Sequence, residues 1–198
     1  MFLLFETIAC ENGQLKNLKW HTIRLNNSRK DLFGCKDHVS LEMIKIPSFA
    51  ETDKWKCRVL YNKAISVISF EPYTPRNIKT IRLVESEISY QYKYEERTEL
   101  DDLFKMRDGA DEILLIKNGM ATDTSIANLL LFDGHEWITP DTPLLEGTMR
   151  AFLIEQGSIK IKPVRKIDLF SYKKLMLINA LNPFDESRAI ELPSAILL

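Results

Sequence analysis

Three short stretches hold the residue types in this sequence that could do chemistry. Lys93 lies in YQYKYEERTEL (residues 90–100) with three tyrosines around it. A lysine amine is usually a solvated surface group, but it can also act as a nucleophile. LLEGTMRAFLIEQG predicts a helix that starts after Gly147, and its exposed first-turn amides form a candidate anion site. The small polar segment TDTSIAN (residues 122–128) lies between two apolar runs.

Length and composition restrict the class of protein. The chain has 198 residues and 45% hydrophobic content, enough for one or two globular domains. Lysine plus arginine (27) and aspartate plus glutamate (28) leave a net charge of -1, so bulk charge gives no reason to expect nucleic acid or a membrane surface. The three cysteines show no CxxC spacing, so we expect no disulfide framework and no metal site, and we place the protein in the reducing cytoplasm. The apolar start MFLLF turns polar too early for a signal peptide or a membrane helix.

The first 75 residues are expected to form a small lobe. A turn signal at Glu11-Asn12-Gly13 predicts a hairpin between two short apolar runs. Helical spacing of leucines predicts a helix over residues 18–33, ended by Gly34. KCRVLYNKAISVISFEPY predicts two strands with a turn at Asn62-Lys63. The two prolines of EPYTPRN favour a linker, so we divide the chain near residue 75.

The second lobe, residues 76–198, is expected to hold most of the strands. IKTIRLVES predicts a strand and TELDDLFKMRDGA a helix. Turn signals at Asn118-Gly119 and Asp133-Gly134 then divide three apolar runs, which is typical of an antiparallel meander. After the helix that follows Gly147, KIDLFSYKKLMLINALNPF predicts another helix that runs into a strand or loop.

Five segments, in this order, resemble the class IV aminotransferase family of pyridoxal phosphate enzymes, also called fold type IV: FETIACENGQLKNLKWHTIRL, KYEER, ATDTSIANL, LLEGTMRAFLI and INALNPF. The GTMR and NAL segments look closer to aminodeoxychorismate lyase than to branched-chain aminotransferases. The resemblance implies a two-domain α+β fold like that of D-amino acid aminotransferase. The small N-terminal α/β lobe would be residues 1–75, and the larger C-terminal lobe, residues 76–198, would carry the lysine and a mostly antiparallel sheet.

Pyridoxal 5'-phosphate is the cofactor that this resemblance implies. Lys93 takes the place of the family's Schiff-base lysine, whose amine both holds the cofactor aldehyde and moves protons at the substrate α-carbon. Arg24, in WHTIRL, takes the place of the arginine that holds the phosphate. Arg97 is a further cofactor-side candidate, open to the phenolic oxygen together with the tyrosines near Lys93. Arg97 and Arg58 are also candidates for a substrate carboxylate.

The remaining site residues follow from the same resemblance. Gly147 and Thr148 match the phosphate-binding turn, and Asn179 and Ala180 match a second contact on the phosphate side. Asp123 takes the place of the carboxylate that keeps the ring nitrogen protonated, where most of the family has glutamate.

Two polar residues inside the matching segments are left out of the chemistry. His21 is expected to be a packed or capping histidine, and Asn128 to support the local backbone. The family typically carries one more strand and a GDG segment before the part that matches Phe5-Glu6-Thr7, so the sequence is short at this end. The resemblance therefore specifies the cofactor more closely than the substrate.

Three functions follow from the resemblance. The first is a lyase that eliminates pyruvate from an amino-chorismate substrate; the second is a branched-chain or D-amino acid aminotransferase; the third is a homologue that binds the cofactor with little turnover. Either enzyme would act on a small molecule and, like its family, would be a homodimer. Each assigned residue also has an ordinary structural interpretation as a solvated side chain, a helix start or a turn.

Overall fold

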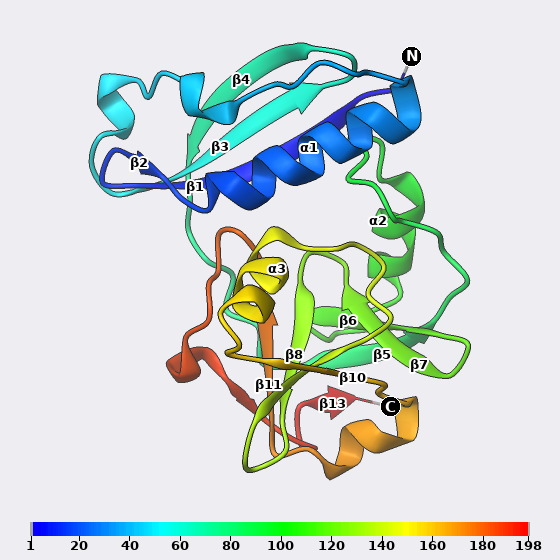
Figure 1. Cartoon of the computed structure of the whole chain (residues 1–198). Coiled ribbons are helices and arrows are strands. Elements are labelled where there is room, and N and C mark those ends of the chain that lie inside the picture. The colour runs from blue at the N-terminus through cyan, green and yellow to red at the C-terminus, as the bar shows by residue number, and fades with distance from the viewer. Residues whose placement is uncertain (1, 198) are drawn as a thin grey trace. The chain divides into compact units, whose positions relative to one another are not determined.

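The computed structural model describes residues 2–197, which form two compact units. The first unit contains residues 2–75 and 92–96, and the second contains residues 76–91 and 97–197. Each unit has its own sheet (Figure 1) and its own hydrophobic core.

The first unit consists of a four-stranded antiparallel sheet and one long helix (Figure 1). The sheet order is β2-β1-β3-β4. Its elements are β1 (Leu4–Glu11), β2 (Gln14–Leu15), α1 (Leu18–Phe33), β3 (Lys54–Tyr61) and β4 (Ile65–Pro72), with short 3-10 helices η1 (Leu41–Met43) and η2 (Ser48–Ala50). Both predicted hairpins and the predicted helix are confirmed.

Local sequence explains the bounds of α1. Gly34, just past the helix, has φ 68°, and its N–H donates to Lys30 O at 3.0 Å. Only glycine takes this left-handed conformation without steric cost, so the helix ends where the sequence predicts. One face of α1 is buried, and it mixes Leu25 with three polar residues, His21, Ser28 and Arg29. A buried helical face with this much polarity requires partners within the unit.

A segment far along the chain completes this unit. Phe5 N–H donates to Lys93 O and Glu95 N–H donates to Leu3 O, both at 2.9 Å, so residues 92–96 lie along the edge of β1. Leu4 and Tyr94 form an antiparallel bridge. The sequence divided the chain once, near residue 75, and expected the lysine in the second lobe. The structure groups Lys93 with the first unit, because its main chain pairs with β1.

The second unit contains a larger mixed sheet with helices packed on it. The central sheet order is β10-β9-β8-β7-β6-β5-β13, and β11 pairs with both β8 and β12. The elements are β5 (Ile81–Glu85), α2 (Thr98–Lys105), β6 (Glu112–Lys117), β7 (Met120–Thr124), β8 (Asn128–Phe132), β9 (Trp137–Pro140), α3 (Thr148–Glu155), β10 (Lys160–Lys162), η3 (Lys166–Ser171), β11 (Lys174–Ile178), η4 (Glu186–Arg188), β12 (Ile190–Glu191) and β13 (Ile196–Leu197).

Most neighbouring strands of the second unit are antiparallel, as expected for the larger lobe. The predicted meander is β6-β7-β8-β9, with its turns at Asn118-Gly119 and Asp133-Gly134. Parallel pairs join β5 to β6, β5 to β13, and β9 to β10. From residue 166 the sequence predicts a helix that runs into a strand or loop: the strand is confirmed as β11, whereas the helix before it is only the 3-10 helix η3. β11 pairs with β8 over five residues, and this non-local pairing outweighs the local helical spacing.

Two further features of the described residues concern membranes and metal ions. Within residues 2–197, no helix has both the length and the apolar run needed to cross a bilayer. The same residues contain no group of three or more His, Cys, Asp or Glu side chains placed to hold a metal ion.

Candidate active site

Lys93 lies on the first unit with its amine next to an aromatic ring. Side chains alternate along paired strands, so Tyr92 and Tyr94 pack on the core side while Lys93 points to the other face of β1. Its Nζ lies 4.7 Å from the centroid of the Phe5 ring, and the residue is half-buried. Arg58 approaches the same ring, with Cζ 4.0 Å from the centroid. The Lys93 amine is therefore stabilised by its contact with an aromatic ring and is not fully solvated.

The opposite face of β1 carries a buried cluster of charged and polar groups. Glu6 is 0% exposed, and its carboxylate accepts hydrogen bonds from Arg24 Nε to Oε1 at 2.9 Å and from Arg24 Nη2 to Oε2 at 2.5 Å. His21 Nδ1 lies 2.6 Å from Glu6 Oε2. Arg24, at 15% exposed, is the only one of the three side chains that reaches the surface. The expectation that His21 is packed is confirmed.

The charge state of this cluster follows from burial and pairing. Burial by itself would raise the pKa of Glu6, but the charge of Arg24 and the hydrogen bonds from His21 and Arg24 lower this pKa to about 2. Burial also lowers the pKa of His21, against the opposing effect of Glu6, and the charges of Arg24 and Lys93 lower it further. At neutral pH Glu6 is therefore ionised and His21 neutral. Arg24, on α1, and Lys93, on the segment beside β1, therefore both act on the same imidazole.

Asp123 is a buried carboxylate of the second unit, and the groups that donate hydrogen bonds to it are neutral. Its Oδ1 accepts from Asn128 Nδ2 at 2.8 Å, and its Oδ2 accepts from Leu145 N–H at 2.9 Å. Asp123 is 5% exposed, and burial raises its pKa to about 6, although these hydrogen bonds and the charge of Arg150 act in the opposite direction. Asn128 also donates to Leu145 O, so it supports the local backbone as the sequence suggested.

Gly147 is required here for space rather than for backbone conformation. It precedes α3 with φ −70°, which any residue can adopt. A Cβ at this position would lie 1.8 Å from Asn128 Oδ1, which excludes a side chain. The start of α3, with the buried Thr148 as its first residue, is thereby brought against the turn between β7 and β8.

Two further predicted residues contact the same turn. Arg97 Nη2 donates to Ser125 O at 2.6 Å, and its buried Nε has no hydrogen-bond partner within the described residues. Asn179 donates to Ile126 O at 3.1 Å and closes its own tight turn around Ala180 by pairing with Asn182.

The turn at residues 124–127 is therefore the point where separated segments of the second unit meet. Around it the structure brings together Arg97, Asp123, Gly147 and Asn179, with Thr148 and Ala180 next to two of them. Lys93 and Arg24 belong instead to the first unit.

Sequence reasoning missed two buried carboxylates. Glu6 holds Arg24, and Glu112 accepts from Ser125 Oγ at 2.6 Å and thereby fixes the turn at residues 124–127. Both are 0% exposed. A signal was present, since Glu6 interrupts an apolar strand in LLFETIAC and Glu112 starts one in DEILLI.

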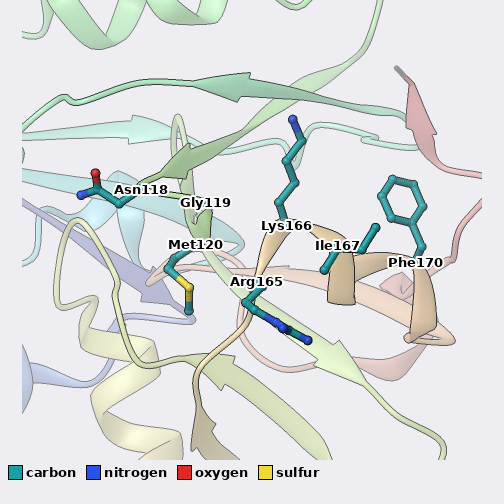
Figure 2. Close-up of a pocket in the computed structure, with 7 residues that line it drawn as sticks. All are labelled: Asn118, Gly119, Met120, Arg165, Lys166, Ile167 and Phe170. Carbon is teal, nitrogen blue, oxygen red and sulfur yellow. The ribbon is translucent and has the colours of Figure 1, made fainter.

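A separate pocket of about 460 Å³ lies on the second unit, and none of the predicted site residues lines it. Figure 2 shows the residues that line it: Asn118, Gly119, Met120, Arg165, Lys166, Ile167 and Phe170. Its two cations already have carboxylate partners, since Arg165 pairs with Asp168 and Lys166 with Glu85. We assign it no part in the site.

Residues 3–184 match the model of the amino-transferase class IV family. The chain belongs to the class IV aminotransferase family. Its members are pyridoxal phosphate-dependent aminotransferases and lyases with fold type IV, so the family and the fold predicted from the sequence are both confirmed.

Individual class IV relatives span most of this chain. An uncharacterised protein of Haemophilus influenzae is 35% identical over 187 residues, covering 92% of this chain and 99% of that protein. A Haemophilus somnus 129PT protein, proposed to be a 4-amino-4-deoxychorismate lyase, has a crystal structure with TM-score 0.82 and 35% identity, covering 93% of this chain and 98% of that one.

More distant structures share the fold alone. One is a proposed amino-acid aminotransferase of Mesorhizobium loti, with TM-score 0.80, 23% identity and 100% of both chains covered. Another is a hypothetical aminotransferase of Mycobacterium tuberculosis in a PLP-bound form, with TM-score 0.72 and 15% identity, covering 96% of this chain and 80% of that one.

The residues present suit a pyridoxal phosphate group. The first unit offers a primary amine held at a ring face and a guanidinium held by a carboxylate. The second offers a buried carboxylate, a crowded glycine at a helix start and the buried Nε of Arg97, which makes no hydrogen bond within the described residues and lies 3.9 Å from Asp101 Oδ1. A carboxylate oxygen can accept more than one hydrogen bond, so the bonds to Asp123 do not prevent a contact with a ring nitrogen.

Proposed function

We propose that this protein is a pyridoxal phosphate-dependent lyase that eliminates pyruvate from 4-amino-4-deoxychorismate and leaves an aromatic amine. The observation that carries the cofactor assignment is the convergence of Arg97, Asp123, Gly147 and Asn179 on one turn. These four residues are far apart in sequence, and one ligand with a phosphate and a ring nitrogen accounts for all of them. The 35% identity to the Haemophilus somnus protein supports the lyase reaction.

When bound, pyridoxal phosphate supplies the electron sink that makes a proton next to the substrate amino group acidic. In this proposal Lys93 Nζ would hold the cofactor by its aldehyde and would also remove the proton from the substrate carbon that bears the amino group. The amine can move between these two tasks because its stem is flexible and its main chain is fixed to β1.

The other residues bind and orient the cofactor. Arg24 and the main-chain N–H groups beside Gly147 and Thr148 bind the phosphate, with Asn179 and Ala180 on the same side. Asp123 keeps a proton on the ring nitrogen, and a pKa of about 6 leaves this carboxylate mostly ionised at neutral pH. Arg97 contributes the guanidinium N–H that the turn at residues 124–127 leaves unused.

The family also supports an aminotransferase, which would use the same proton transfers and then pass the amino group to a keto acid. A homologue that binds the cofactor without useful turnover is the remaining possibility. We further propose that the protein is a homodimer in the cytoplasm. The edge strand β4 of the first sheet, with Val67 49% and Ile68 41% exposed, supports an association of this kind.

One set of assays tests these proposals together. Purified protein should turn yellow with pyridoxal phosphate, and borohydride should then attach the cofactor to the peptide that contains Lys93. Lys93→Arg should abolish both effects, whereas Lys105→Arg, at an exposed lysine on α2, should change neither. A protein that stays colourless at saturating cofactor would contradict the cofactor assignment.

The reaction is decided by the need for an acceptor. Release of pyruvate from 4-amino-4-deoxychorismate without any keto acid is the expected result for the lyase. Turnover that depends on added 2-oxoglutarate or pyruvate would instead identify an aminotransferase. Light scattering coupled to size exclusion measures the mass, and a monomer at working concentration would contradict the dimer.

A further inference from the structure

Glu6 is a fully buried carboxylate in the middle of a strand. It alternates along β1 with Leu4 and Ile8, which belong to the core of the first unit. Burying a carboxylate is costly unless hydrogen bonds and an opposite charge compensate for the lost water. All the compensation that is seen for Glu6 comes from α1, through Arg24 and His21. If this position served the fold alone, an apolar side chain would fill it at a lower cost in free energy. The carboxylate therefore needs a separate explanation.

The geometry of the pair restricts the guanidinium. The carboxylate takes Arg24 side-on, through Nε and Nη2, so two parallel hydrogen bonds determine both the plane and the direction of the group. A guanidinium has five N–H donors, and this pair occupies two of them. The donors on the far side, at Nη1, therefore point in a direction set by Glu6. Arg24 is also the member of the cluster that reaches the surface.

His21 holds the carboxylate from a second side without adding charge. Its neutral imidazole donates Nδ1–H to Glu6 Oε2, since an ionised carboxylate can only accept. One negative charge is therefore matched to one positive charge, and the carboxylate cannot rotate away from Arg24.

We propose that Glu6 is a positioning residue, which aims Arg24 at the phosphate of the cofactor and so makes binding selective for the phosphorylated form. This inference rests on the proposed function, in which Arg24 binds that phosphate. A positioning role weakens binding of pyridoxal 5'-phosphate more than binding of pyridoxal, which has the same ring and aldehyde but no phosphate. A residue that only stabilises the fold changes both affinities alike.

The test compares the dissociation constants of the two ligands, measured by absorbance titration, in wild type and in Glu6→Gln. We expect the preference for pyridoxal 5'-phosphate to fall about tenfold, the lower end of what loss of an orienting partner costs at metal sites. An equal loss for both ligands, no loss, or a stronger preference for the phosphorylated form would each overturn the proposal. Should Glu6→Gln fail to fold, Glu6→Asp keeps the buried charge but withdraws the carboxylate by one methylene, and the same fall is expected.

A double-variant cycle adds a readout that fold stability does not move. If Glu6 acts through Arg24, the variant Arg24→Gln/Glu6→Gln should lose no more preference than Arg24→Gln does. Additive losses would contradict an action through Arg24.

The matched control lies on the same helix, where Arg29, 2% exposed, pairs with Asp37 at 2.7 Å. Asp37→Asn removes the carboxylate partner of an α1 arginine and should leave the preference unchanged. Wild-type protein that binds neither ligand would remove the proposed function as well, an outcome distinct from binding without the expected selectivity.

Discussion

Glu6 of the first unit and Asp123 of the second are buried carboxylates that different kinds of partner stabilise. Glu6 is compensated by a guanidinium and an imidazole, and its pKa is lowered to about 2. Asp123 is compensated by a main-chain amide and a side-chain amide, and burial raises its pKa to about 6. Both side chains are almost inaccessible to water, so burial alone does not explain the difference between their pKa values. The charge of the hydrogen-bond partner does, because a charged donor offsets the loss of water around an ionised oxygen more strongly than a neutral donor.

The difference suits the two proposed roles. A carboxylate that orients Arg24 works only while it is ionised, and its pKa of about 2 ensures this at every physiological pH. A carboxylate next to a ring nitrogen shares a proton with it, and a pKa of about 6 brings Asp123 close to the range where such sharing occurs.

The largest effect is expected from removing the cation that compensates Glu6. Arg24→Met should lower the free energy of unfolding by about 3 to 5 kcal/mol at pH 7, because it leaves a charge buried next to a neutral imidazole. Urea unfolding measures this loss. Arg24→Met/Glu6→Gln should recover most of it, and a single-variant loss below about 1 kcal/mol would show that Glu6 is not compensated by Arg24.

The pH dependence of Glu6 should have one sign. Its folded pKa lies below the ordinary value of 4.5, so the stability it contributes is present above pH 4.5 and is lost as pH falls toward 2. Lowering the pKa of Glu6 from 4.5 to about 2 corresponds to about 3 kcal/mol of folding stability, at about 1.36 kcal/mol for each pKa unit. Urea unfolding of wild type and Glu6→Gln, compared between pH 2 and 6, tests it, and a constant difference would contradict it.

The pH dependence of Asp123 should have the opposite sign. Its folded pKa lies above the ordinary value of 3.8, so its favourable contribution is present below pH 3.8 and is lost as pH rises through 6. The shift of 6 − 3.8 = 2.2 units corresponds to about 3 kcal/mol. In cofactor-free protein, wild type should therefore lose stability relative to Asp123→Asn between pH 4 and 7. A difference that instead grows in favour of wild type would place Asp123 in the same class as Glu6.

The smallest effect is expected at the glycine that admits Asn128. Gly147→Ala should cost about 1 to 3 kcal/mol, the usual range for overpacking, because its Cβ displaces Asn128 from Asp123. Thermal unfolding of the apoprotein measures the loss. Adding Asn128→Ala removes the clash, so a double variant that is no better than Gly147→Ala would assign the cost to the helix start instead.

Features that depend on residues close together in sequence could be predicted, whereas features that depend on distant contacts could not. The hairpin turn at Asn12-Gly13 and the end of α1 at Gly34 were readable, because their left-handed backbone depends on residues next to one another. The segment from residue 166 was predicted only in part: its strand, β11, is present, but its helix is only the 3-10 helix η3, because the chain extends to pair with β8 far away in sequence. The role of Gly147 was given a local explanation, an anion at a helix start, whereas the structure gives the glycine a partner nineteen positions earlier, Asn128.

The sequence by itself determined the family, the fold type and which residue types stand at each matching position, since ordered motifs and local turn chemistry are properties of the linear chain. Only the tertiary structure decided that Lys93 pairs with β1 in the first unit, that Glu6 holds Arg24, and that four distant segments meet at the turn of residues 124–127. The contacts that make these features join residues 18 or more positions apart in sequence. Their energies depend on burial and on the charge of the partner, and neither quantity exists until the chain has folded.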